Sequence, residues 1–185
     1  EDAVKRDVGA LLLKLEGQFP EDQRPLYRDF VLRFQQLTAP IMAKGLEDTA
    51  FYIDNRLISL NEVGGDPSHF GTSPGDFHKL NLERGRRWPA ALVTTSTHDT
   101  KRSEDVRMRI NALSELPDEW SAEITAWSLL NEKHRTQVSD SPAPSRNTEY
   151  FLYQTMLGVW PDEPLEEPAM DELRRRLWQH TLKSL

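Results

Sequence analysis

The stretch Ala91-Leu-Val-Thr-Thr-Ser-Thr-His-Asp-Thr-Lys-Arg102 decides how the rest of the chain is interpreted. It passes from a short apolar run into a dense polar cluster, and then into a helical pattern that begins near Ser103. This order predicts a strand over residues 91–95 that leads into a helix through a polar turn. In α/β proteins, residues at the carboxyl end of such a strand face the site where ligands bind. We therefore expect functional residues in this turn.

The polar side chains of the turn have two interpretations. Asp99 or Ser103 could cap the following helix through a side-chain oxygen, with His98 in a structural role, because polar residues often serve caps and turns. Alternatively, His98, Asp99 and Lys101 could face a ligand at the end of the strand. The residues of the turn alone leave both interpretations open.

Composition limits the class of protein. The chain has 185 residues, enough for one domain or for a piece of a larger one, and it contains no cysteine. Disulfides and thiolate metal sites are therefore excluded, which fits a reducing compartment. No apolar run approaches the roughly 20 residues that span a bilayer, and the N-terminal residues show no signal-peptide pattern. We expect a cytoplasmic protein with no membrane partner.

Charge and histidine spacing restrict the ligands. The formal net charge is −7, which argues against a nucleic-acid partner, because phosphate binding needs a basic surface. A neutral, polar ligand such as a sugar is compatible with this charge. His69, Asp76 and His78 match no known metal-ligand spacing. We expect neither a metal ion nor another cofactor.

Helical periodicity dominates the chain, so the predicted fold is mainly α with at most one or two short strands. Helical patterns begin near residue 2, Pro25, Ile41, Ser103, Pro117 and Asn147, and a last one reaches Leu185. The second pattern carries Tyr27, Phe30, Phe34 and Leu37 on one face, which predicts a buried face. Pro40 is expected to break or kink this helix.

Two segments lack helical periodicity. Residues 61–87 are crowded with glycine and proline and are expected to form a long loop, a feature that is usually functional or mobile in a compact domain. Residues 139–145 are expected to form a turn-rich linker.

A polar group, Lys44, Glu47 and Asp48, lies inside the helix predicted over residues 41–52. Lys44 and Asp48 are four residues apart, which predicts an exposed ion pair on the helix surface.

Four segments together resemble one family. They are Phe34-Gln-Gln-Leu-Thr-Ala-Pro-Ile-Met-Ala-Lys-Gly-Leu-Glu-Asp-Thr-Ala-Phe-Tyr52, Asn55-Arg-Leu-Ile-Ser-Leu-Asn-Glu-Val-Gly-Gly-Asp-Pro67, Thr95-Ser-Thr-His-Asp-Thr-Lys-Arg-Ser-Glu-Asp-Val-Arg107 and Tyr153-Gln-Thr-Met-Leu-Gly-Val-Trp-Pro161. Their order resembles the malto-oligosyltrehalose synthases, a branch of glycoside hydrolase family 13 in the α-amylase superfamily. The resemblance is strongest over residues 33–110.

The resemblance implies a (1→4)-α-D-glucan 1-α-D-glucosylmutase, an isomerase of trehalose biosynthesis. Its substrate would be a malto-oligosaccharide, whose reducing-end α-1,4 link becomes an α,α-1,1 link by intramolecular transglycosylation. Asp99 falls on the position of the superfamily's aspartate that stabilises the oxocarbenium-like sugar, with His98 beside it as a ligand of sugar hydroxyls. The resemblance also places Lys101 at the substrate, and Lys44, Glu47 and Asp48 around the reducing-end glucose.

The chain also departs from the superfamily pattern. No segment matches the motifs that carry the nucleophile and the acid/base glutamate, and a complete barrel needs about 250 residues. We therefore expect a helical region of a (β/α)8-barrel enzyme, inactive by itself. Residues 1–88 would be a helical insertion with the long loop, and residues 89–185 a barrel strand, the catalytic turn and helices. The alternative is a non-catalytic helical module that binds another protein.

Overall fold

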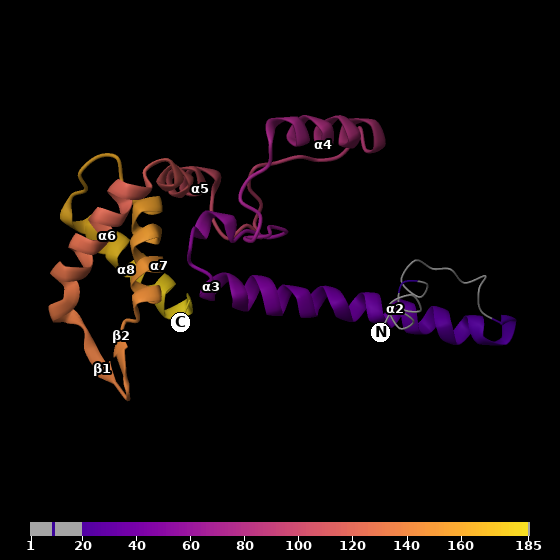
Figure 1. Cartoon of the computed structure of the whole chain (residues 1–185), viewed down its shortest axis with the longest axis horizontal. Helices are drawn as coiled ribbons and strands as arrows, with labels where there is room; N and C mark the ends of the chain where they lie inside the picture. Colours follow the sequence, from indigo (N-terminus) through magenta and orange to yellow (C-terminus); the bar gives the residue numbers. More distant parts are fainter. Residues whose placement is uncertain (1–8, 10–19, 185) are drawn as a thin grey trace. The chain divides into compact units, whose positions relative to one another are not determined.

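A computed structural model describes Gly9 and residues 20–184 of the chain. The chain divides into two compact units, residues 1–49 and 50–185 (Figure 1). The helix predicted over residues 2–17 lies outside the described residues, apart from Gly9. The division predicted after residue 88 rests on the family pattern and stays a prediction.

The first unit contains a long helix, which begins where a helical pattern was predicted near Pro25. Its described elements are η2 (Glu21–Gln23), α2 (Arg24–Met42) and most of the π-helical turn η3 (Ala43–Ala50). Pro25 lies in the first turn of α2, where its missing N–H costs no hydrogen bond. Tyr27 and Val31, one helical turn apart, are buried, whereas Phe30 is half exposed. The predicted aromatic face is therefore only partly right, because the buried stripe runs through Val31.

Pro40 does not break α2. The helix continues through Pro40 to Met42, and the backbone then widens into the π-helical turn. Proline cannot donate the hydrogen bond that an α-helix needs at this position. After the proline the helical hydrogen bonds resume, because the Ala43 N–H donates to the carbonyls of Ala39 and Pro40. The helix predicted over residues 41–52 is thus present, with π geometry over most of its length.

The second unit is mainly α, as the periodicity predicted. Its elements are α3 (Phe51–Ile53), η4 (Ile58–Leu60), α4 (Pro74–Arg87), α5 (Glu104–Asn111), η5 (Ala112–Glu115), α6 (Pro117–Asn131), η6 (Glu132–His134), β1 (Thr136–Val138), β2 (Ser141–Ala143), α7 (Arg146–Val159) and α8 (Glu167–Ser184). None of the helices over the described residues is long and apolar enough to cross a membrane.

The core of this unit lies where η4, α5 and α7 meet. Ile58, Ile110 and Phe151 are buried there, and four further apolar side chains pack against them: Leu57, Val106, Leu113 and Leu152. The helix predicted from near Ser103 is therefore present as α5, and its apolar side chains pack in this core. Helix α7 approaches α5 closely at Gly158, where an added Cβ would lie 2.8 Å from Val106 Cγ1. This packing fixes the helix that follows the polar turn.

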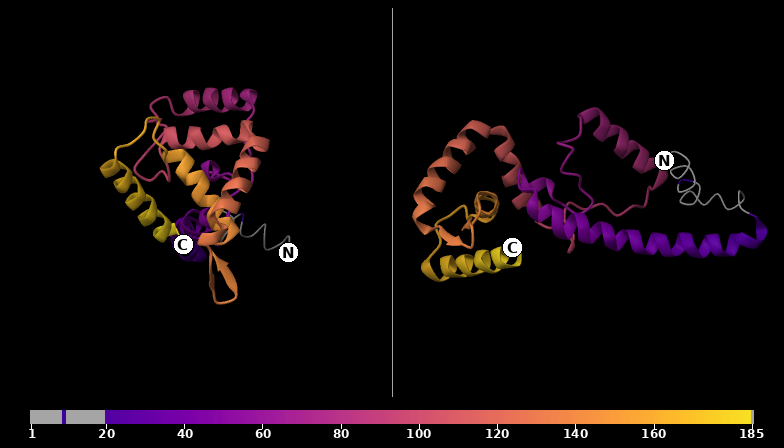
Figure 2. Two further views of the ribbon diagram at one scale, coloured as in Figure 1. Left: turned by 90° about the vertical axis from the view of Figure 1, so that its left-hand side faces the viewer. Right: turned by 60° about the horizontal axis from the view of Figure 1, so that its bottom comes forward.

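The predicted strand over residues 91–95 is not formed. The described residues contain two strands, β1 and β2, which pair antiparallel in a hairpin between α6 and α7 (Figure 2). The hairpin occupies part of the predicted linker over residues 139–145. Leu92 and Val93 are exposed, and residues 91–95 have no neighbouring strand with which to form a ladder. Because a strand needs a partner for its backbone groups, this segment stays an unpaired connection.

The loop predicted over residues 61–87 is wrong in its second half, which forms α4. Ser73 caps this helix, because its Oγ accepts a hydrogen bond of 3.1 Å from the Asp76 N–H. Pro74 occupies the first helical position, which it favours. The capping signal lies inside a run of glycine and proline, which masked it.

Candidate functional site

The turn over residues 97–100 presents His98 and Asp99 to solvent. Their side chains are 91% and 71% exposed, and His98 Nε2 lies 3.4 Å from Asp99 Oδ1. The turn is closed by its own hydrogen bonds. Thr97 Oγ1 accepts from the Asp99 N–H at 3.2 Å, and Thr100 Oγ1 donates to the Thr97 carbonyl at 2.8 Å. The structure therefore brings the two predicted residues together on one ordered turn.

Asp99 does not cap α5. The N-cap residue is Ser103, whose side chain makes no capping hydrogen bond. Ser96 Oγ instead accepts from the Glu104 N–H at 3.1 Å and donates to the Glu104 carboxylate. Since another residue provides the cap, the capping interpretation of Asp99 and Ser103 is wrong.

Glu62, which the sequence did not single out, holds the end of this turn. Its Oε1 accepts from the N–H groups of Val63 at 2.7 Å and Lys101 at 2.8 Å. Its Oε2 accepts from Arg107 Nη1 at 3.1 Å and from the Arg102 N–H at 3.4 Å. Burial alone would raise the pKa of Glu62, but the N–H groups of Lys101 and Val63 and the Arg107 guanidinium outweigh it and lower the pKa. The carboxylate is therefore ionised at neutral pH.

The segment that carries Glu62 is itself fixed. Asn61 is buried, and its side-chain amide donates to the carbonyls of Phe51 at 2.9 Å and Asp54 at 2.6 Å. Arg102 Nη1 donates to the Ile58 carbonyl at 3.1 Å. Residues 58–62 and the polar turn are thus joined by several hydrogen bonds.

Lys101 lies on the same turn but points to an aromatic ring. Its Nζ is 5.5 Å from the centre of the Tyr52 ring, an arrangement that favours a cation.

Lys44, Glu47 and Asp48 lie in the first unit, on the π-helical turn. The ion pair predicted there is confirmed, because Lys44 Nζ lies 2.5 Å from Asp48 Oδ2. The hydrogen bond to Asp48 raises the pKa of Lys44. Glu47 is half-buried on the same turn.

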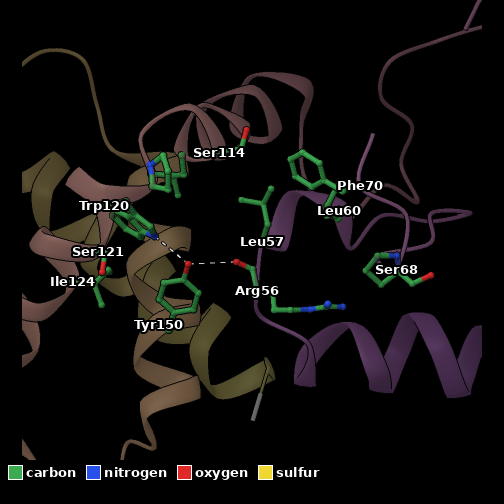
Figure 3. A pocket seen from close by; sticks show the side chains of 13 residues that line it. Arg56, Leu57, Leu60, Ser68, Phe70, Ser114, Trp120, Ser121, Ile124 and Tyr150 are labelled. Carbon is green, nitrogen blue, oxygen red and sulfur yellow. Dashed lines mark hydrogen bonds between the residues drawn. The ribbon is translucent and has the colours of Figure 1, made fainter. Parts of the chain in front are cut away.

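A separate groove of about 520 Å³ lies in the second unit (Figure 3). Trp120 Nε1 donates to the Tyr150 hydroxyl at 3.1 Å, and this hydroxyl donates to the Arg56 carbonyl at 3.3 Å. The charged residue that lines the groove is Arg56, whose guanidinium forms an ion pair with Asp54. The groove contains none of the predicted site residues.

The next question is whether side chains in the described part of the chain gather into a metal site. The described residues contain no group of three or more His, Cys, Asp or Glu side chains that could hold a metal ion. His69 Nδ1 instead pairs with Asp66 Oδ2 at 2.8 Å.

Comparison with known proteins gives a consistent set of relatives, although no family model matches the chain. A maltooligosyl trehalose synthase of Mycobacterium tuberculosis is 46% identical over 154 residues, which are 83% of this chain and 18% of that protein. The solved structure of the Sulfolobus tokodaii maltooligosyl trehalose synthase aligns with a TM-score of 0.73 and 39% identity, over 89% of this chain and 21% of that one. A mutant of the Arthrobacter ramosus maltooligosyltrehalose synthase aligns with a TM-score of 0.67 and 42% identity, over 83% and 18%. The chain spans about a fifth of the length of these relatives.

Proposed function

This chain corresponds to a segment of the maltooligosyl trehalose synthases, and we propose that the complete protein is a (1→4)-α-D-glucan 1-α-D-glucosylmutase of glycoside hydrolase family 13. Its substrate is a malto-oligosaccharide, its role is in trehalose biosynthesis, and its location is the cytoplasm. The identity and the TM-scores over more than four fifths of the chain support this proposal.

The reaction conserves every atom of the substrate, which makes it an isomerisation. The α-1,4 bond to the reducing-end glucose breaks, and the O4 atom of this glucose takes up a proton. The anomeric hydroxyl of the same glucose then attacks the glycosyl C1 atom and gives up its proton as the α,α-1,1 bond forms. Retaining enzymes use a nucleophilic carboxylate and an acid/base carboxylate for such steps. Both belong to motifs that we do not find in this chain, so the 185 residues are inactive by themselves.

Asp99 supplies electrostatic stabilisation in this scheme. Positive charge develops on the sugar ring in the transition state, and a fixed carboxylate stabilises it through charge-assisted hydrogen bonds to ring hydroxyls. His98 binds neighbouring hydroxyls. The observation that carries this assignment is the exposure of Asp99 on a turn that is hydrogen-bonded to Glu62 and has no capping role.

Lys44, Glu47 and Asp48 hold the released glucose until its anomeric hydroxyl attacks, with Lys101 at the substrate as well. Loosened contacts to this glucose would let water compete for the glycosyl intermediate. A Lys44→Ala variant of the complete protein is therefore expected to release more free glucose per trehalose end formed. Chromatography of the products of maltopentaose measures this ratio, and an unchanged ratio would remove Lys44 from the site.

Asp99→Asn in the complete protein tests the catalytic assignment. We expect kcat to fall by at least about 10²-fold, the scale on which a preorganised electrostatic contact is lost. Asn caps helices nearly as well as Asp, so a residue with a purely local role would tolerate the change. Asp105→Asn, which alters another exposed acid of the same region, is the control and should retain wild-type turnover. Wild-type turnover in Asp99→Asn would refute the assignment.

The alternative function, a non-catalytic module that binds another protein, is favoured by one observation. Trp88, Leu92 and Val93 are apolar, neighbouring in sequence and each at least 70% exposed. This module would leave the complete protein with no activity on maltopentaose, whereas the isomerase converts it to a non-reducing product.

A further inference from the structure

The Glu62 clasp, defined as the Glu62 carboxylate and its donors on Val63, Lys101, Arg102 and Arg107, ties two segments that lie about 40 residues apart. We propose that Glu62 is a positioning residue of the reaction, which sets where the Asp99 side chain stands relative to the sugar. This inference rests on the proposed function.

The chemistry of the clasp requires a carboxylate. An ionised carboxylate only accepts hydrogen bonds and has about four lone-pair sites, which matches the four donors found here. A glutamine side chain has only one acceptor oxygen. Its own NH2 group would face some of the N–H donors that the carboxylate now accepts from. At least one side of the clasp would then be lost, either the Lys101 and Val63 side or the Arg107 and Arg102 side.

The backbone around Glu62 is tightly folded. The Gly65 N–H donates to the Glu62 carbonyl at 2.7 Å. An added Cβ at Gly65 would lie 2.8 Å from this oxygen and 3.0 Å from the Leu60 carbonyl, so the backbone is tightly folded under Glu62. Asn61 fixes the preceding residue. The backbone that carries Glu62 is therefore held by its own hydrogen bond, by close packing and by Asn61.

The clasp restrains the turn on both sides of Asp99. After Asp99, Glu62 accepts from the N–H groups of Lys101 and Arg102. Before it, Arg107, the ion-pair partner of Glu62, donates to the Thr95 carbonyl. A change at Glu62 therefore shifts both ends of the turn.

Glu62 acts through the turn and does not touch the sugar. Its side chain is only 18% exposed, and that of Arg107 is 14% exposed, in contrast to Asp99. A displacement of about 1 Å in a reacting or stabilising group costs about 10²-fold in rate. We therefore expect Glu62→Gln to lower kcat by at least about 10-fold while KM changes by less than about 3-fold, since binding elsewhere on the oligosaccharide is intact.

A double-mutant cycle in the complete protein tests this inference. Glu62→Gln is compared with wild type, and Glu62→Gln/Asp99→Asn with Asp99→Asn, with maltopentaose as substrate. If Glu62 works through Asp99, its substitution should lower kcat by less than about 3-fold once Asp99 is gone, because residues that act as a unit are not additive. Glu172→Gln, which breaks an exposed ion pair on α8, is the control and should leave kcat unchanged.

The outcomes separate the two proposals. An equal loss of kcat in both backgrounds would show that Glu62 supports the fold only, and would overturn the positioning role. Normal turnover in Asp99→Asn would overturn the proposed function, and this inference with it. If Glu62→Gln fails to fold, Glu62→Asp keeps the charge and shortens the clasp by one methylene. We expect it to lower kcat with a melting temperature close to that of wild type, and wild-type kcat in Glu62→Asp would contradict the proposal.

Discussion

Glu149→Gln should destabilise the second unit strongly, because Glu149 is a buried charge with several partners. Its side chain is 8% exposed. It accepts hydrogen bonds from Ser128 Oγ at 3.1 Å and the Tyr153 hydroxyl at 2.8 Å, and it pairs with Arg135 and Arg146. A glutamine can still accept from Tyr153, but it leaves the charge of Arg135 without a counter-charge.

The exposure of each partner sets the expected size of the effect. The Arg135 side chain is 14% exposed, so it cannot recover full hydration once Glu149 is neutral. Breaking a buried ion pair by removing one partner costs about 3–5 kcal/mol, and we expect the lower end, about 3 kcal/mol. For a protein of this size this corresponds to a fall in melting temperature of about 6–12 °C. Arg146→Gln removes a partner that is 59% exposed and should cost less than about 1 kcal/mol.

Urea unfolding followed by tryptophan fluorescence measures the free energy of unfolding of both variants, since Trp127 packs edge-on against Tyr153 with ring centroids 5.3 Å apart.

Burial raises the pKa of Glu149, but the hydrogen bonds from Tyr153, Ser128 and Arg135 outweigh it and lower the pKa below its usual 4.5. The contribution of Glu149 is therefore complete above the unfolded pKa and is lost as the pH falls through the folded pKa. Equal stability losses in Glu149→Gln and Arg146→Gln would refute this reasoning.

Two further predictions concern the helices. Gly158→Ala should lower the free energy of unfolding in urea by about 1–3 kcal/mol, because the added methyl group overpacks against Val106 and Ile110. Gly85→Ala is the control: no atom lies within 4 Å of the added methyl group, so the change should not lower the free energy of unfolding and should strengthen α4. Ser73→Ala should weaken α4 by about 1 kcal/mol through loss of its cap, measured as faster hydrogen exchange of the α4 amides.

Each of these two predictions has an outcome that would contradict it. Equal stability of Gly158→Ala and wild type would mean that α5 and α7 are packed less tightly than the structure shows. Unchanged exchange in Ser73→Ala would mean that the Ser73 hydroxyl does not determine where α4 begins.

Local patterns predicted most of the helices, with the exception of α4, because the information for a helix lies within a few turns of chain. The helical pattern near Ser103 predicted α5, and Pro117 marked the start of α6. The polar turn in the sequence pointed to His98 and Asp99, and the family resemblance implied their roles; the structure places the two side by side on the turn. Their role in catalysis remains a prediction.

Apart from α4, the features that the sequence did not predict depend on contacts between distant residues. Glu62 meets Lys101 across 39 residues, and a single acid in a glycine-rich segment gives no sign of such a partner. The strand expected over residues 91–95 needs a neighbouring strand that the described residues do not supply. The hairpin of β1 and β2 arises in a segment whose serine and proline content favoured a linker.

A crystal structure of the complete protein with a bound malto-oligosaccharide would show directly whether the Asp99 carboxylate lies against the sugar. We predict that the Asp99 carboxylate accepts hydrogen bonds of about 2.5–2.7 Å from hydroxyls of the ring next to the scissile bond, with His98 at a neighbouring hydroxyl and Glu62 behind the turn without sugar contact. An oligosaccharide bound elsewhere, with residues 97–101 in solvent or covered by protein, would contradict the account.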